Sequence, residues 1–160
     1  IWPVEPLIDA KLARTRKISK KMLPMAKTMQ GVNSTLARLE AREYGCFESI
    51  MLDIEDMVCE GSSSNIFWIK GDDIYTPSLD LDVLDGSIRN TIMNNFDVKE
   101  VVCGVKELKN ADEIFFSNVA WILTNVNNCM DIGFNNGKNN ISQQIKSKLV
   151  DIIQKQLKSI

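Results

Sequence analysis

The sequence contains no histidine, and this absence removes several kinds of chemistry. A Ser-His-Asp or Cys-His hydrolase needs an imidazole to accept the proton of its nucleophile, so neither can be built from this chain. The four cysteines stand far apart without a C-x-x-C pair, which is not a zinc-ligand pattern. We therefore expect no metal site, and proton transfer must use a lysine, tyrosine, aspartate or glutamate.

Long apolar runs and a strong excess of one charge are also lacking. No stretch approaches the ~18 apolar residues of a membrane span, and no signal peptide is visible. The net charge is −2, and isolated cysteines fit a reducing compartment. We expect a cytoplasmic protein that binds neither membrane nor nucleic acid. The chain begins at Ile1 rather than at methionine, so we expect it to be a piece of a longer protein.

One basic cluster runs from Lys11 to Lys21. No aromatic residues are interleaved with its charges, as they are in many nucleic-acid surfaces. We interpret it as a solvated strand and turn. A phosphate-contacting or nucleic-acid patch is the alternative.

The 160 residues, of which 44% are hydrophobic and 25% charged, suffice for one domain with its own core. Alternation predicts a first strand within Lys11–Lys20 and two hairpins, "SIMLDI" with "MVCE" and "NIFWIK" with "DIYTP". Helices are expected from an Asn33 N-cap, from Gly86 to Asn95, and near the C-terminus. In that last helix, one face carries Ile145, Leu149, Ile152, Ile153 and Leu157. This pattern predicts an α+β fold with a mixed, largely antiparallel sheet or barrel and flanking helices.

Three features at the ends of these elements are typical of binding sites. Lys27 lies among apolar residues, and a desolvated lysine becomes a nucleophile or a base. Glu60 ends a strand and precedes a glycine and three serines, small residues that let a planar group approach the backbone. "DGSIRN" places Gly86 at the start of a helix, where free N–H groups bind phosphate. An aldehyde, a basic ring nitrogen and a phosphate together describe pyridoxal 5′-phosphate (PLP).

Four segments, in order and at matching spacing, resemble the class IV aminotransferase family of fold-type IV PLP enzymes: "AKTMQGVNSTLARLEAREYG", "VCEGSSSNIFWIKGDDIYTP", "LDGSIRN" and "ADEIFFSN…ILTNV". The resemblance implies that Lys27 carries the cofactor covalently and moves the Cα proton. It implies that Glu60 pairs with the pyridine nitrogen. The remaining cofactor-binding residues that it implies are Ser63, Ser64, Asn65, Ser87, Ile88, Asn118 and Val119.

The sequence departs from the family pattern at several hydroxyl positions. Gln30 stands where the family often has asparagine, Ile88 where aminotransferases have threonine, and Val119 where a hydroxyl is common. The T-P-V after the last strand is "TNV" here. These departures place hydroxyl contacts to the phosphate in doubt, while backbone contacts are unaffected.

The resemblance also implies domains, partners and activity. Residues 1–23 are expected to be an interdomain connection with the first strand, and residues 24–160 the larger PLP-binding domain. The smaller N-terminal domain is missing from this chain, and the family predicts a homodimer acting on a small amino substrate. "NIFWIKGDDIYTP" and "FFSNVAW" favour 4-amino-4-deoxychorismate lyase, which forms 4-aminobenzoate and pyruvate for folate biosynthesis. The alternatives are a D-amino acid or branched-chain aminotransferase and a non-catalytic PLP-fold domain.

Overall fold

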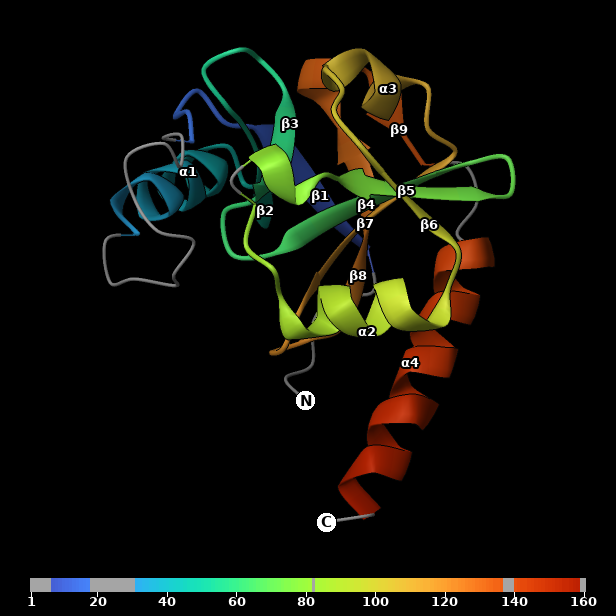
Figure 1. Ribbon diagram of the computed structural model, residues 1–160. Helices are drawn as coiled ribbons and strands as arrows, with labels where there is room; N and C mark the ends of the chain where they lie inside the picture. Colours follow the sequence, from blue (N-terminus) through green and yellow to red (C-terminus); the bar gives the residue numbers. More distant parts are fainter. Residues whose placement is uncertain (1–6, 18–30, 82, 137–139, 159–160) are drawn as a thin grey trace.

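The computed structural model describes residues 7–17, 31–81, 83–136 and 140–158. Over these residues the strands curl into one sheet with helices around it (Figure 1). The strands are β1 (Leu7–Leu12), β2 (Glu48–Leu52), β3 (Val58–Gly61), β4 (Asn65–Lys70), β5 (Asp73–Pro77), β6 (Val98–Val101), β7 (Glu113–Asn118), β8 (Ile122–Cys129) and β9 (Phe134–Asn135). The helices are α1 (Val32–Glu43), α2 (Ser87–Asn95), α3 (Val105–Lys109) and α4 (Asn140–Lys158), with short 3₁₀ turns η2 (Leu79–Leu81) and η3 (Met130–Ile132).

The sheet has the order β3-β2-β1-β8-β7-β4-β5-β6, with β9 added to β8. Strand β1 pairs in parallel with β2 and β8, and β5 pairs in parallel with β6. All other pairings between the named strands are antiparallel. The predicted α+β fold with a mixed, largely antiparallel sheet is confirmed.

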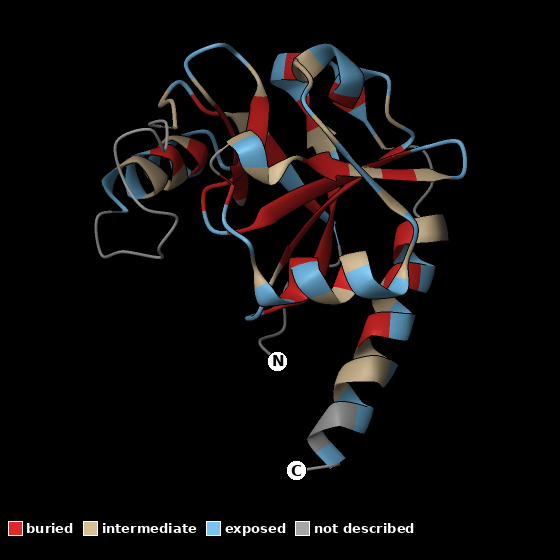
Figure 2. Cartoon of the chain, in the orientation of Figure 1, coloured by how far each residue is buried: buried red, intermediate tan, exposed pale blue. Residues whose placement is uncertain are grey.

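Strands β4 and β7 are buried on both faces, so their alternate side chains pack into two separate hydrophobic cores. Ile66, Trp68 and Phe116 enter one core, which also contains Ile50 and other residues of β1, β2 and β8. The residues between them in β4 and β7 enter the second core, beneath α2 and α4. Figure 2 shows these central strands as largely buried segments, whereas exposed residues lie in loops, on outer helix faces and on outer strands such as β6. The site described below lies where α2 begins, at the margin of the second core.

Both predicted hairpins are present, since β2 pairs with β3 and β4 with β5. Two other predictions need correction. The first strand ends at Leu12, and residues 13–17 are not strand, because Arg14 and Thr15 instead donate backbone hydrogen bonds to the Glu40 carboxylate of α1. Residues 18–20 of the predicted strand lie outside the described residues. Asn33 lies inside α1 and does not cap it, because its amide donates to the Arg16 carbonyl oxygen at 2.8 Å.

The C-terminal helix α4 begins on a buried acid. The Glu113 carboxylate of β7 accepts the backbone N–H groups of Ile141 and Ser142, at 3.0 and 2.9 Å. Free N–H groups at a helix start carry partial positive charge, so this carboxylate anchors the helix electrostatically as well as by hydrogen bonding. Ile145 and Leu149 are buried in the second core, as the apolar face predicted. None of the helices over the described ranges has the length and hydropathy needed to cross a membrane.

Candidate functional site

Glu60 is a largely buried carboxylate at the end of β3. Its side chain is only 10% exposed, and Lys17 forms an ion pair with Oε1. The backbone N–H of Leu84 donates to Oε2 at 2.8 Å. This second contact joins the acid to the segment that leads into α2. A buried carboxylate with a fixed orientation is suited to binding a cationic N–H group of a ligand.

The start of α2 is packed closely against the start of β4. Gly86 is the N-cap residue, and a Cβ atom at this position would lie 2.3 Å from Asn65 Oδ1. The Asn65 amide donates to the Leu84 carbonyl oxygen at 2.7 Å, which holds the same segment from the other side. No side chain within the described part of the protein caps α2. Its first N–H groups, including those of Ser87 and Ile88, are therefore available to an anion.

The side chains of Ile88 and Arg89 point away from that anion position. Ile88 is buried in the second core beside α4, so the residue that replaces the family threonine contributes packing. Arg89 is only 2% exposed and donates to the Pro77 carbonyl oxygen at 3.3 Å and to Glu100. It also lies 3.4 Å from Asp85 in the preceding turn. The helix start therefore offers backbone groups to a ligand, and these two side chains fix the helix to the sheet.

The serines that follow Glu60 surround a second carboxylate, Glu48, which is completely buried. The Ser63 hydroxyl donates to Glu48 Oε2 at 2.8 Å and the Ser64 hydroxyl at 2.9 Å. Ser62 donates both its hydroxyl and its N–H, the latter at 3.0 Å, to Oε1. Arg38 of α1 supplies a positive charge 3.3 Å away. Hydrogen bonding to Glu48 thus explains the three serines, whereas the sequence suggested that small residues leave room for a ligand and the resemblance implied that Ser63 and Ser64 bind the cofactor.

Gly61 allows this serine loop to turn tightly. A Cβ atom at Gly61 would lie 2.2 Å from the Ser64 hydroxyl oxygen and 3.2 Å from Phe116. The backbone N–H of Gly61 donates to the Ser64 carbonyl oxygen at 2.7 Å, which closes the turn. Any larger residue here would push the loop away from Glu48.

The loop after β7 reaches the serine loop from the opposite side. The Asn118 amide donates to the Ser63 carbonyl oxygen at 3.1 Å, and its Oδ1 accepts the N–H groups of Ala120 and Trp121. Val119 is 69% exposed at the tip of this turn. Asn118 therefore joins two of the predicted binding segments, while Val119 presents an apolar side chain to solvent.

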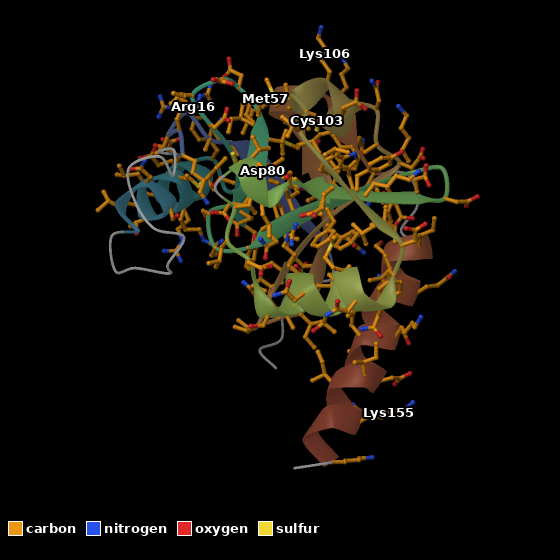
Figure 3. All side chains as sticks on the ribbon, viewed as in Figure 1. Arg16, Met57, Asp80, Cys103, Lys106 and Lys155 are labelled. Carbon is orange, nitrogen blue, oxygen red and sulfur yellow. The ribbon has the colours of Figure 1, made fainter. Side chains whose placement is uncertain are left out.

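Lys27 falls outside the described residues, so the predicted covalent anchor is not placed. The other predicted residues lie on three segments, Glu60–Asn65, Leu84–Ile88 and Asn118–Val119, which hydrogen bonds connect to one another. Within the described part of the basic cluster, the solvated interpretation is wrong for Lys17, whose side chain is 19% exposed and faces Glu60. It is also wrong for Lys11, whose side chain is 12% exposed and pairs with Asp131. Arg16, labelled in Figure 3, fits that interpretation better. Its side chain pairs at 2.7 Å with the exposed Asp56.

Sequence reasoning missed Glu48 and Lys17 as parts of this region. For Glu48 a signal was present, because an acid inside the apolar run "FESIML" requires partners once the strand is buried. For Lys17 no signal distinguishes it from the lysines around it. Over the described residues, no group of three or more acids and cysteines is arranged to hold a metal ion.

Comparison with known proteins identifies the family. The model of the class IV aminotransferases matches residues 3–129. A probable branched-chain-amino-acid aminotransferase of Thermotoga maritima is 34% identical over 123 residues, covering 73% of this chain and 44% of the relative. The branched-chain-amino-acid aminotransferase of Escherichia coli is 30% identical over 142 residues, covering 84% of this chain and 46% of the relative. This chain thus spans less than half the length of those relatives.

The fold is similar to that of a solved aminotransferase structure. The branched-chain aminotransferase of Thermoproteus uzoniensis, crystallised with norvaline, superposes with a TM-score of 0.85 and 31% identity. The superposition covers 91% of this chain and 51% of that protein.

Proposed function

The chain belongs to the class IV aminotransferase family, and we propose that it forms the cofactor-binding part of a PLP-dependent aminotransferase. The observation that carries the proposal is the hydrogen bond from the Leu84 N–H to Glu60 Oε2. It places a buried carboxylate beside the segment that opens α2, whose N–H groups have no side-chain cap. An acid for the ring nitrogen and an anion site for the phosphate are two of the groups that PLP requires.

The residues of the site fit this cofactor. Glu60 would hold the pyridine nitrogen, and the N–H groups of Ser87 and Ile88 would hold the phosphate. The close contact between Gly86 and Asn65 keeps the helix start in place, since a Cβ would occupy that space. When bound, PLP supplies an electron sink that weakens the bonds at the substrate Cα. Lys27 would carry the cofactor and move the Cα proton.

The substrate class is proposed from the relatives. Those named above are branched-chain aminotransferases, and we propose an amino acid with an apolar side chain as the amino donor. The sequence favoured aminodeoxychorismate lyase through "NIFWIKGDDIYTP" and through the segment that contains Asn118. In the structure Asn118 donates to the Ser63 carbonyl oxygen and organises its own turn. This role gives it no preference for the lyase, which we keep as the alternative outcome of the test.

The domain and assembly predictions are part of the same proposal. Residues 24–160 would form the larger domain, and a second domain outside this chain would complete the substrate pocket. A homodimer would be the working form. Light scattering of the complete protein, loaded with PLP, would test the assembly.

The first experiment tests for a covalent bond between Lys27 and PLP. The protein is incubated with PLP and reduced with borohydride, and the modified peptide is identified by mass spectrometry. We expect modification at Lys27, and we expect Lys27→Ala to lose it. The Glu60→Gln variant should retain Lys27 but bind PLP more weakly, by roughly tenfold or more for a lost charged hydrogen bond. Absence of a Lys27 adduct would contradict the proposed cofactor role.

The second experiment separates the two reactions. The complete protein with PLP is given leucine and a keto acid acceptor, and separately aminodeoxychorismate without any keto acid. Transfer of the amino group from leucine supports the aminotransferase. Release of pyruvate and 4-aminobenzoate without an acceptor would favour the lyase instead.

A further inference from the structure

Among the described residues of its basic cluster, Lys17 is the one whose charge is directed at Glu60. Its ammonium group forms an ion pair with Glu60 Oε1, and the two side chains are 19% and 10% exposed. By contrast Arg14 in the same cluster has a side chain that is 72% exposed. Removing two charges from water is costly unless each compensates the other. The proposed ring contact of Glu60 does not by itself explain why a lysine is also paired with this carboxylate.

The backbone around Lys17 is held in place from two sides. Its own N–H donates to the Leu52 carbonyl oxygen of β2 at 2.8 Å. Asn33 of α1 holds the carbonyl oxygen of the preceding residue, Arg16, also at 2.8 Å. Glu40 of α1 accepts the N–H of Arg14 at 2.7 Å. Because the main chain is fixed by α1 and β2, little further ordering is needed to direct the Lys17 side chain at Glu60.

Lys17 leaves room on Glu60 for a ligand. An ionised carboxylate has about four lone-pair sites. Lys17 uses one on Oε1 and the Leu84 N–H uses one on Oε2. A ring N–H can therefore bind Glu60 without displacing either partner. A neighbouring cation also favours the charged form of a carboxylate, and only the charged form can stabilise a protonated ring nitrogen.

We propose that Lys17 is a positioning residue for the cofactor: it keeps Glu60 charged and oriented so that this carboxylate can bind the protonated ring nitrogen. This inference rests on the proposed function, because it assumes that PLP occupies the site. Lys17 itself does not touch the reacting atoms. It acts through Glu60, so its effect must depend on the ring nitrogen of the ligand.

The test compares PLP with its 1-deaza analogue, in which carbon replaces the ring nitrogen. Binding of each ligand to the complete protein is measured for the wild type, Lys17→Met and Lys17→Arg. We expect Lys17→Met to weaken PLP binding by roughly tenfold, the equivalent of one charged hydrogen bond, and to leave the binding of the deaza analogue unchanged. Lys17→Arg retains the charge and should bind PLP as the wild type does. Equal weakening of both ligands would overturn the proposal.

Lys11→Met is the matched control, because it removes another lysine of the cluster that pairs with a different acid, Asp131, at 3.3 Å. It should bind both ligands as the wild type does. Thermal unfolding of each variant identifies any that fail to fold. If the wild type binds neither ligand, the proposed function fails, whereas unchanged PLP binding by Lys17→Met overturns the inference alone.

The effect of Lys17 on the charge of the Glu60 carboxylate can also be measured without any ligand. The side-chain carboxyl carbons of glutamate are labelled with ¹³C, and the Glu60 signal is assigned by its loss in Glu60→Gln. In Lys17→Met this signal should take up a proton at higher pH than in the wild type, because the neighbouring cation is gone. Identical titration of Glu60 in the two proteins would overturn the inference whether or not PLP binds.

Discussion

Glu48 receives two hydrogen bonds from Ser63, one from its hydroxyl at 2.8 Å and one from its N–H at 3.3 Å. These bonds join β2 to the loop that directly follows the Glu60 carboxylate. The hydrogen bonds that shape the loop are therefore made within the protein and need no ligand. The stability of the loop depends on an acid that no ligand needs to touch.

Replacement of Glu48 should be strongly destabilising. In Glu48→Ala the Ser63 N–H and the hydroxyls of Ser62 and Ser64 lose their Glu48 acceptor, and the Ser62 N–H keeps only the Ser49 carbonyl oxygen at 3.2 Å. We expect the free energy of unfolding to fall by about 3 kcal/mol or more, the usual cost of removing one partner of a buried ionic cluster. Urea denaturation provides the measurement. The isosteric Glu48→Gln keeps one acceptor oxygen and should lose less, so an equal loss in both variants would contradict this explanation.

Because Gly86 and Asn65 are in contact, the effects of substitutions at the two positions on the free energy of unfolding should not add. The backbone at Gly86 has φ −74°, which any residue can adopt, so only the lack of space opposes a larger side chain. Gly86→Ala should cost about 1–3 kcal/mol of unfolding free energy, as overpacking does. In an Asn65→Ala background the same change should cost much less. A cost that is equal in both backgrounds would show that Asn65 is not the obstacle.

Acid should weaken the anchor between α1 and the segment before Lys17. Burial acts to raise the pKa of Glu40, but hydrogen bonds from Thr15 and from the Arg14 N–H outweigh it, and the pKa lies below its usual value of 4.5. A lowered pKa means that Glu40 adds stability above its unfolded pKa and loses it as the pH falls through the folded pKa. Glu40→Gln should therefore be less stable than the wild type at neutral pH. Denaturation in progressively stronger acid should show this difference shrinking, and a constant difference would contradict it.

The thiols should react in an order set by burial. Burial, with a smaller contribution from Asp131, raises the pKa of Cys129 to about 12, and burial with Glu107 raises that of Cys103 to about 11. The thiolate fraction of Cys129 is then roughly a thousandfold below that of a thiol with the ordinary value of 9.0. Timed alkylation with iodoacetamide, followed by peptide mass spectrometry, should label the partly exposed Cys46 before Cys103 and Cys103 before Cys129. Equal rates in the native protein would contradict this order, and unfolded protein should label all three alike.

The hairpins could be predicted because their signals are local. Gly71 adopts φ 62° and Asp56 φ 61°, conformations that glycine and aspartate tolerate better than most residues, and each lies at a turn between alternating strands. The parallel pairing of β1 with β2 and β8 could not be predicted in this way. Those partners are distant in sequence, and nothing in the first strand specifies them.

Site residues were predictable where local sequence or a family motif marks them. Glu60 and the start of α2 were first singled out from the small residues beside them, and the resemblance then gave each a role. Glu48 contacts serines 14 to 16 positions away, and that proximity depends on the register that pairs Ile50 with Gly61. Asn33 was predicted to cap α1 from its propensity, but the carbonyl of Arg16 offered its side chain a tertiary partner instead. In both cases long-range packing decided the role of the side chain.

The buried Arg89 has a consequence for how ligand binding would spread through the protein. Arg89 lies in the first turn of α2 and donates to Pro77 at the end of β5 and to Glu100 on β6. An anion held by the first turn would stabilise the folded form of this whole unit, because anything that binds only the native state opposes its opening. Amide hydrogens of β5 and β6 would then exchange more slowly with solvent, although neither strand touches the ligand. Hydrogen exchange at the outer edge of the sheet would in this way reveal whether the anion site is occupied, although β5 and β6 contain none of the proposed site residues.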